Sequence, residues 1–248
     1  RAAFAELNPG LPLAAIEKAV ESLKEDRRAM PPQEASKAFH GLLRGGVKVR
    51  VPDGKGGTVT ETVRVIDWKS PRNNHFFIAD EFIVQGELYQ RRADIVGFVN
   101  GLPLLHIELK APDVPVKANY DKNLRSYLTD IPQFYTPNGL TMLSNGTETR
   151  LGSAFAPWEF FFDWKKVDSE QEKGSVSLET ALRGTCAPER FLDILENFIV
   201  YEKDRGGLIK KIAKNHQYLG VTNAMRAVKR SRQNNDGRLG VFWHTQGS

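Results

Sequence analysis

The spacing of apolar residues changes along the chain from a helical to a strand-like period. Between residues 13 and 24 the large aliphatic residues recur every three or four positions, and Pro12 precedes them at a site suited to a first helical turn. A similar pattern follows Pro32. We therefore expect helices over residues 13–24 and 32–43, ahead of a β-rich region.

The β-rich region shows alternating or short apolar runs separated by turn residues. A helical pattern over 120–128 interrupts these runs, and Asn145-Gly146 is a further turn signal. The pattern predicts an α/β fold, with a mixed β-sheet flanked by helices. The expected strands are 47–51, 58–67, 75–78, 81–88, 96–99, 104–107, 141–144 and 147–151.

A dense run of charged residues between 163 and 174 has the composition of a linker. Beyond it the spacing predicts helices over 188–201 and 218–229, then a buried strand over 240–243. We accordingly divide the chain into a first domain, 1–168, and a second part, 169–248.

Acidic and basic side chains gather around the apolar hairpin at the centre of the chain. Asp94 precedes its first strand, Asn100-Gly101 forms the expected turn, and Glu108 and Lys110 follow its second strand. A strict two-residue turn would pair Asp94 with Ile107 and turn it to the opposite face. We therefore expect a bulge at Gly101, or a kink at Pro103, that brings Asp94 opposite Glu108.

Two carboxylates beside a lysine suit metal-dependent phosphate chemistry. Mg²⁺ prefers oxygen ligands and keeps several waters, so Asp94 and Glu108 suffice as its protein ligands. Lys110 would then orient the attacking water or neutralise a phosphate, and its acidic neighbours favour the charged form. An isolated Glu-x-Lys is more often a salt-bridged, solvated strand end, so the preceding Asp and hairpin are what favour catalysis.

These residues resemble the PD-(D/E)xK nuclease superfamily, and more closely the amino-terminal part of the restriction (motor) subunit of type I restriction-modification enzymes. Ala93 stands where the family's proline is expected, a position outside the chemistry. The resemblance covers the segments IDWKSPRNNHFFIADEF (66–82), DIVGFVNGLPLLHIELKAP (94–112), DIPQFYTPNGLTMLSNGTETRLGS (130–153) and GVFWHTQGS (240–248).

The resemblance implies a restriction-endonuclease-like fold, followed by a helical segment and the start of a helicase-like domain. It implies Mg²⁺-dependent cleavage of double-stranded DNA, with Asp94 and Glu108 as metal ligands and Lys110 as the catalytic lysine. The implied partners are duplex DNA and the modification and specificity subunits of a type I complex. Site recognition would reside in a separate subunit.

Further positions around the predicted site have weaker support. Asn123 and Tyr127 occupy the place of a Gln-x-x-x-Tyr motif in related nucleases, and i, i+4 spacing puts both on one helical face. A surface Asn and a half-buried Tyr explain them equally well. Arg91 and Arg92, just before Asp94, are candidates for phosphate contact. His106 shares the Glu108 face, although a packed strand histidine is the commoner case.

The last residues resemble the opening of a helicase phosphate loop. Thr245, Gly247 and Ser248 would belong to it, but the chain stops before the lysine that such a loop needs. Gln217 resembles the adenine-reading glutamine of such motors, with an ordinary helix-start glutamine as the alternative. We expect ATP binding in the full-length protein alone, and interpret the chain as a fragment.

Composition agrees with this interpretation. The formal charge of +5 over 248 residues is compatible with a polyanionic partner. The single cysteine, Cys186, excludes an internal disulfide and a multi-cysteine zinc site, and favours a reducing, cytoplasmic setting. No apolar run reaches transmembrane length, and we expect no membrane association. The competing functions are a non-catalytic DNA-binding or assembly module and a stand-alone Holliday-junction resolvase, which the helicase-like tail disfavours.

Overall fold

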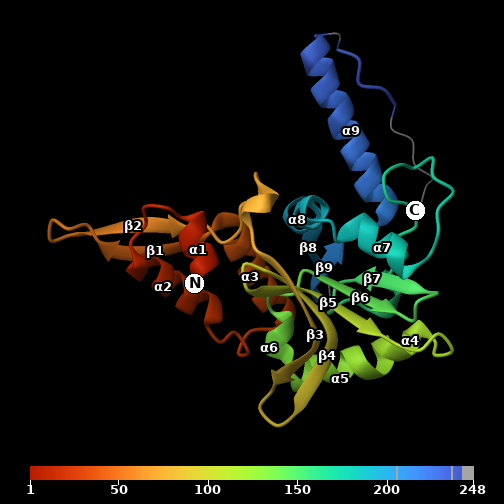
Figure 1. The fold of residues 1–248 in the computed structure, drawn as a ribbon, viewed down its shortest axis with the longest axis horizontal. Coiled ribbons are helices and arrows are strands. Elements are labelled where there is room, and N and C mark those ends of the chain that lie inside the picture. The colour runs from red at the N-terminus through yellow and green to blue at the C-terminus, as the bar shows by residue number, and fades with distance from the viewer. Residues whose placement is uncertain (205, 236, 242–248) are drawn as a thin grey trace.

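The computed structural model describes residues 1–204, 206–235 and 237–241. The chain forms three parts: a protruding N-terminal wing, a central mixed sheet covered by helices, and a C-terminal hairpin followed by a long helix (Figure 1). None of the described helices is long and apolar enough to span a membrane.

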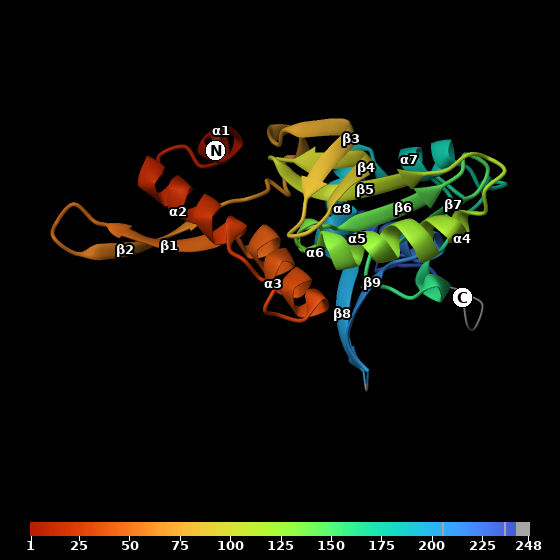
Figure 2. The ribbon, with the colours of Figure 1, turned by 90° about the horizontal axis from the view of Figure 1, so that it is seen from below.

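The wing is a two-stranded ribbon supported by helices. Strand β1 (Val47–Pro52) pairs antiparallel with β2 (Thr58–Val63), and alternate β1 residues are buried. Helix α2 (Leu13–Lys24) packs on β1, as its apolar stripe predicts. The wing also contains α1 (Ala2–Leu7). Helix α3 (Pro32–Gly45) lies between the wing and the rest of the molecule, as Figure 2 shows.

The central sheet has the strand order β3-β4-β5-β6-β7. Strands β5 and β6 are parallel, and the other neighbours are antiparallel, so the sheet is mixed. Strand bounds are β3 (Phe76–Gln85), β4 (Gln90–Val99), β5 (Leu102–Leu109), β6 (Leu140–Ser144) and β7 (Thr149–Gly152). The predicted mixed sheet is confirmed.

Helices cover both faces of this sheet. On one face lies the helical run α4 (Val116–Ala118), η2 (Asn119–Leu124), α5 (Arg125–Asp130) and α6 (Pro132–Tyr135), as Figure 2 shows. The opposite face packs against α8 (Pro188–Asn197), whose Leu192 and Leu195 share a core with Leu104 and Leu140. Burying each such leucine contributes about 1.5–3 kcal/mol. Strand β5 contributes Leu104, Leu105 and Ile107 to the core on the α8 side.

The remaining helices and strands complete the fold. These are η1 (Pro71–Asn73), η3 (Trp158–Phe160) and α7 (Leu178–Thr185), together with β8 (Ile199–Asp204), β9 (Gly207–Ile212) and α9 (Asn215–Asn234). Helix α9 projects away from the sheet (Figure 1).

Several predicted elements differ from the observed ones. The two strands expected at 75–78 and 81–88 form the single strand β3, in which Glu81 has a positive φ of 46°. The helix expected over 188–201 was wrong beyond Asn197, because residues 199–204 form β8. Strand β2 ends at Val63, four residues before the expected end, and α9 extends past both ends of 218–229. Of the strand expected over 240–243, Gly240 and Val241 lack regular structure, and 242–243 lie outside the described residues.

The hairpin β8–β9 is tied to the rest of the fold by a buried lysine. Lys210 is 4% exposed, and its Nζ donates hydrogen bonds to Ser36 Oγ in α3, at 3.2 Å, and to the carbonyl of Asn138, just before β6. Its ammonium also lies 5.8 Å from the ring centroid of Tyr201. Burial lowers the pKa of Lys210 from 10.5 to about 7.

Candidate nuclease site

The hairpin β4–β5 contains the irregularity that the sequence required. Asn100 and Gly101 form a two-residue turn with positive φ values of 53° and 84°. Phe98 pairs with Pro103, but Gly97 pairs with Leu105, so Leu104 is the extra residue of a bulge. The predicted bulge or kink is confirmed, beside Pro103 rather than at Gly101.

The bulge brings Asp94 to the end of the hairpin that carries Glu108 and Lys110. The last paired residues are Ile95 and Ile107, so the next position on each strand sets Asp94 beside Glu108. Asp94 Oδ2 accepts a hydrogen bond of 2.7 Å from the backbone N–H of Leu109, the residue between Glu108 and Lys110. The side chain of Asp94 is thereby fixed at the end of β5 that carries Glu108 and Lys110.

Glu108 has a buried carboxylate, and one of its two oxygens lacks a hydrogen-bond partner. It is 1% exposed, and Asn123 Nδ2 donates to its Oε1. Its Oε2 lies 3.3 Å from His106 Nε2 but makes no hydrogen bond with any described residue. A buried acceptor without a donor is costly, and such an atom is often explained by a bound ion or water.

Lys110 lies at the edge of the same cluster. Its backbone N–H donates to the Ser144 carbonyl at 2.9 Å, which continues the parallel β5–β6 pairing and fixes the position of the residue. Its Nζ is 3.7 Å from Glu108 Oε1, and its side chain is 29% exposed. The ammonium therefore lies near the carboxylate and is partly exposed to solvent.

The helical run after β5 supplies two more side chains to the cluster. The segment Asn119–Leu124 is a π-helical turn, a feature that often occurs at functional sites, and it presents Asn123 to Glu108. One helical turn later, Tyr127 OH donates to the Arg92 carbonyl at 2.7 Å. Burial, followed by the charges of Glu108 and Asp94, raises the pKa of Tyr127 to about 12.

His106 is fully buried behind Glu108. Its Nδ1 lies 3.1 Å from Tyr135 OH, and its ring packs against those of Tyr127 and Phe134. The sequence favoured a packing histidine, and the structure shows a packed one whose other nitrogen faces Glu108. The alternation of side chains along β5 predicts that His106 and Glu108 share a face, but sequence alone cannot predict that His106 Nε2 lies next to Glu108 Oε2.

The two arginines before Asp94 are engaged by carboxylates outside the acidic pair. Arg91 Nε donates to Asp130 Oδ2 at 2.6 Å, and Arg92 pairs with Glu81 at 3.0 Å. Arg91 is close enough to Tyr127 to lower the pKa of its phenol, whereas the Arg92 side chain is exposed. The Arg91 side chain therefore borders the cluster, while Arg92 contributes its carbonyl.

The residues present fit a magnesium ion held by few protein ligands. Among the described residues, no three His, Cys, Asp or Glu side chains are grouped as metal ligands. Mg²⁺ does not require three, because it binds through one or two carboxylates while keeping water. The buried Oε2 of Glu108, which has no hydrogen-bond partner among the described residues, is the observation that favours such an ion.

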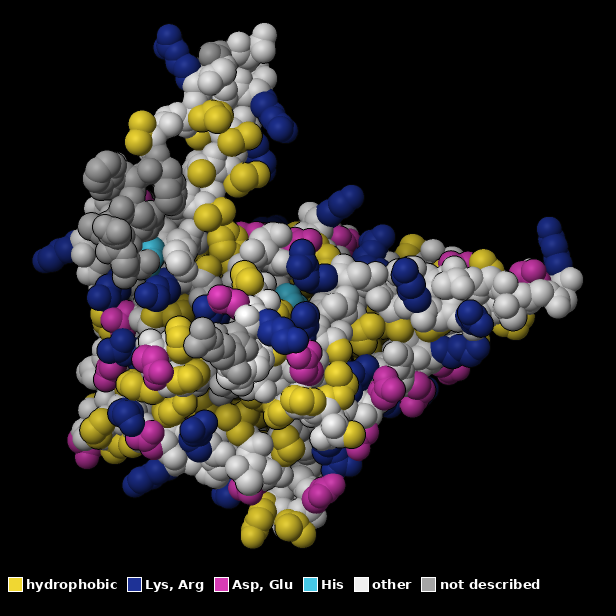
Figure 3. All heavy atoms as spheres, turned by 180° about the vertical axis from the view of Figure 1, so that it is seen from behind, with side chains coloured by type: hydrophobic (Ala, Val, Ile, Leu, Met, Phe, Trp, Pro, Cys, Tyr) yellow, Lys and Arg dark blue, Asp and Glu magenta, His cyan; other side chains and the backbone are white. Residues whose placement is uncertain are grey.

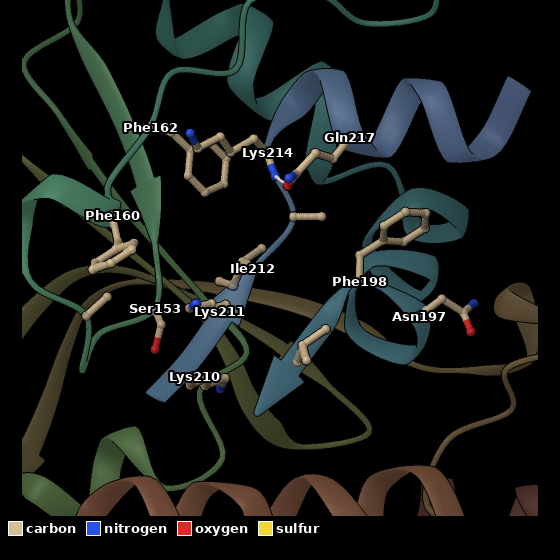
Figure 4. Close-up of a pocket in the computed structure, with 13 residues that line it drawn as sticks. Ser153, Phe160, Phe162, Asn197, Phe198, Lys210, Lys211, Ile212, Lys214 and Gln217 are labelled. Carbon is tan, nitrogen blue, oxygen red and sulfur yellow. Dashed lines mark hydrogen bonds between the residues drawn. The ribbon is translucent and has the colours of Figure 1, made fainter. Parts of the chain in front are cut away.

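Of the residues expected to bind nucleotide, the structure describes Gln217. Gln217 is exposed in the first turn of α9, and its Oε1 accepts a 2.9 Å hydrogen bond from the backbone N–H of Lys214. It borders a pocket of about 390 Å³ that also contains Phe160, Phe198 and Lys211 (Figure 4). The helix-start contact accounts for Gln217 without a ligand, and its adenine role stays a prediction. Thr245, Gly247 and Ser248 lie outside the described residues.

Comparison with known proteins supplies independent information. Residues 1–160 match the family model described as "Type I restriction enzyme R protein N terminus". The chain is 34% identical over 261 residues, covering all of it, to the type I restriction enzyme HindI endonuclease subunit of Haemophilus influenzae. It is 30% identical, over 86% of its length, to a Methanocaldococcus jannaschii protein named as a candidate type I restriction enzyme MjaIXP endonuclease subunit. The chain spans 24% and 22% of these two relatives.

Proposed function

Since the chain belongs to the family of type I restriction enzyme R protein N-terminal regions, we propose that it is the Mg²⁺-dependent endonuclease part of a type I restriction subunit. Its substrate is double-stranded DNA. Its partners are the modification and specificity subunits of the complex, and ATP is used elsewhere in the full-length protein. The restriction-endonuclease-like fold and the helicase-like continuation after residue 168 are parts of the same proposal.

The observation that carries the proposal is the cluster at the end of β4 and β5. Asp94 is anchored to Leu109 N–H, and buried Glu108 keeps one oxygen without a hydrogen-bond donor. Lys110 adds a partly exposed ammonium 3.7 Å from Glu108 Oε1. Ordinary surface ion pairs do not bury an acid to this degree, because removing a carboxylate from water is costly unless it is compensated.

Each residue of the cluster has a role that follows from its contacts. Asp94 and Glu108 would hold Mg²⁺, which when bound activates water and stabilises charge on the phosphate. Asn123 fixes the orientation of the Glu108 carboxylate through Oε1, leaving Oε2 for the ion. Tyr127 fixes the strand next to Asp94 by donating to the Arg92 carbonyl. With a pKa of about 12, its phenol keeps its proton and remains a donor at neutral pH.

Lys110 completes the cluster as an electrostatic group. As an ammonium, Lys110 offers hydrogen-bond donors and no acceptor, and its Nζ lies 3.7 Å from Glu108 Oε1. We therefore assign it to orienting the attacking water and to neutralising the scissile phosphate, rather than to removing a proton.

The test uses isosteric changes in the complete subunit, assembled with its modification and specificity subunits. Asp94→Asn, Glu108→Gln and Lys110→Met should each reduce DNA cleavage by more than the roughly 10- to 100-fold typical of losing a supporting contact. ATP-driven translocation should continue. Glu159→Gln, a change at an exposed acid, is the matched control.

Full cleavage by folded Glu108→Gln enzyme would refute the assignment. If wild-type chain binds DNA but the complete complex shows no cleavage under any Mg²⁺ or Mn²⁺ condition, the non-catalytic module is the correct alternative.

A further inference from the structure

The β1–β2 ribbon of the wing presents two faces of opposite character. The inner face carries alternate valines, among them Val47 and Val49, which are buried against α2. The outer face carries Lys48 and Arg50 on β1, with Thr62 and Thr60 directly across from them on β2. All four outer side chains are exposed.

Positive charge on the outer face is not neutralised. Lys48 and Arg50 on β1, and Lys55 in the connecting turn, have no ion-pair partner within the described part of the chain. The outward positions of both strands contain no acid. The one acid of the turn, Asp53, is occupied by the backbone N–H groups of Lys55 and Gly57, both at 2.8 Å.

The ribbon is held in place from behind. Helix α2 covers its inner face, and Lys18 of α2 donates a 2.6 Å hydrogen bond to the Arg50 carbonyl. The wing extends away from the central sheet in both ribbon views, and Figure 3 shows Lys and Arg side chains along it and at its tip. A supported, projecting ribbon loses little conformational entropy when it meets a partner.

We propose that the outer face of the β1–β2 ribbon binds the phosphate backbone of duplex DNA. Lysine, arginine and threonine are the side chains that contact phosphates, and a two-stranded ribbon can follow a DNA groove. A protein partner is disfavoured because the outward positions carry no large apolar or aromatic anchor. The inference takes DNA as the partner from the proposed function, but it concerns a surface separate from the Asp94–Glu108 cluster.

The experiment measures equilibrium binding of a fluorescent 20-base-pair duplex to the 248-residue chain by anisotropy, between 0.05 and 0.2 M salt. Each phosphate contact contributes about 0.9 to the slope of log K against log salt. Lys48→Ala/Arg50→Ala should lower that slope by about 2, and should weaken binding by tens of fold at 0.1 M salt. The control, Lys173→Ala/Lys203→Ala, removes the same charge from exposed positions outside the wing.

A second measurement tests the proposal without removing the positive charges of the ribbon. A photo-crosslinking amino acid at Thr60 should capture the duplex, whereas the same group at exposed Ser175 should not. Equal losses in the two double variants, or no crosslink at Thr60 under conditions where DNA is bound, would overturn the proposal. Both measurements report DNA binding rather than cleavage, so failure of the ribbon proposal and failure of the nuclease proposal give different results.

Discussion

Replacing Lys210 with methionine should remove a pH dependence of stability that the wild-type chain shows between pH 7 and 9. The lysine is buried, with a pKa of about 7 instead of 10.5. Over this interval the unfolded chain keeps the proton while the folded chain loses it, so the unfolded state binds more protons. Stability therefore rises with pH. The cost of burying the charge is fully present below pH 7 and disappears above pH 10.5.

The magnitude follows from the two pKa values. Each unit of pH contributes at most about 1.4 kcal/mol. Since the folded state starts half protonated at pH 7, the gain by pH 9 is about 2 kcal/mol. For a chain of this length that corresponds to roughly 4–8 °C in Tm. Lys210→Met removes the titration, but it leaves the Asn138 carbonyl without its lysine donor, which costs about 1–3 kcal/mol at every pH.

The assay is urea unfolding of wild type and Lys210→Met at pH 7, 8 and 9, with Lys203→Met as the control at an exposed position of the same hairpin. Wild type and Lys203→Met should gain about 2 kcal/mol relative to Lys210→Met over the series. Parallel curves for all three proteins would refute the reasoning, because they would mean that Lys210 keeps its proton when buried.

Two further predictions concern the support of the site and the packing beneath the sheet. Asn123→Ala removes the donor to Glu108 Oε1, so it should raise the Mg²⁺ concentration needed for half-maximal cleavage by about 10-fold or more. Asn123→Gln should restore much of the loss. An unchanged Mg²⁺ requirement would exclude a positioning role for Asn123. Gly184→Ala should destabilise the chain by about 1–3 kcal/mol or more, because a Cβ there would lie 2.1 Å from Nε1 of buried Trp164. Gly41→Ala in α3, where nothing lies within 4 Å of the added carbon, should instead stabilise by about 0.5–1 kcal/mol; equal urea midpoints for the two variants would contradict the packing argument.

The sequence was sufficient to predict an element where its buried residues recur at a regular spacing. Helix α2 spans the predicted 13–24, since one apolar stripe packs on one partner. The bulge in β4–β5 was also predictable, because Asp94 can lie opposite Glu108 only if the hairpin is irregular. The position of the extra residue, Leu104, could not be predicted, since it depends on the backbone conformation of Pro103 and of the turn.

The predicted helix over 188–201 shows where local pattern fails. Apolar spacing continues through Phe198 and Ile199, so periodicity alone cannot show that α8 ends at Asn197. The β-branched and aromatic run Ile199-Val200-Tyr201, followed by Gly206-Gly207, was a usable hairpin signal. The buried Lys210 on the returning strand obscured it, because its tertiary partners Ser36 and Asn138 are distant in sequence.

Sequence likewise named the residues of the site without giving their contacts. Asn123 and Tyr127 could be matched to a motif, yet the donor to Glu108 depends on a π-helical turn that no local pattern predicts. His106 was assigned to packing because a strand histidine is usually packed. The packing is present, but the proximity of its Nε2 to Glu108 depends on the three-dimensional arrangement of both side chains.

The central claim is that Asp94 and Glu108 bind one metal ion, and anomalous diffraction from crystals grown with Mn²⁺ tests it most directly. Mn²⁺ shares the oxygen-ligand preference of Mg²⁺ and can be located by its anomalous signal. The account predicts a peak between the Asp94 carboxylate and the open Oε2 of Glu108, absent in crystals of Glu108→Gln. A wild-type crystal with Mn²⁺ bound elsewhere, or with no peak at these carboxylates under conditions that support cleavage, would contradict it.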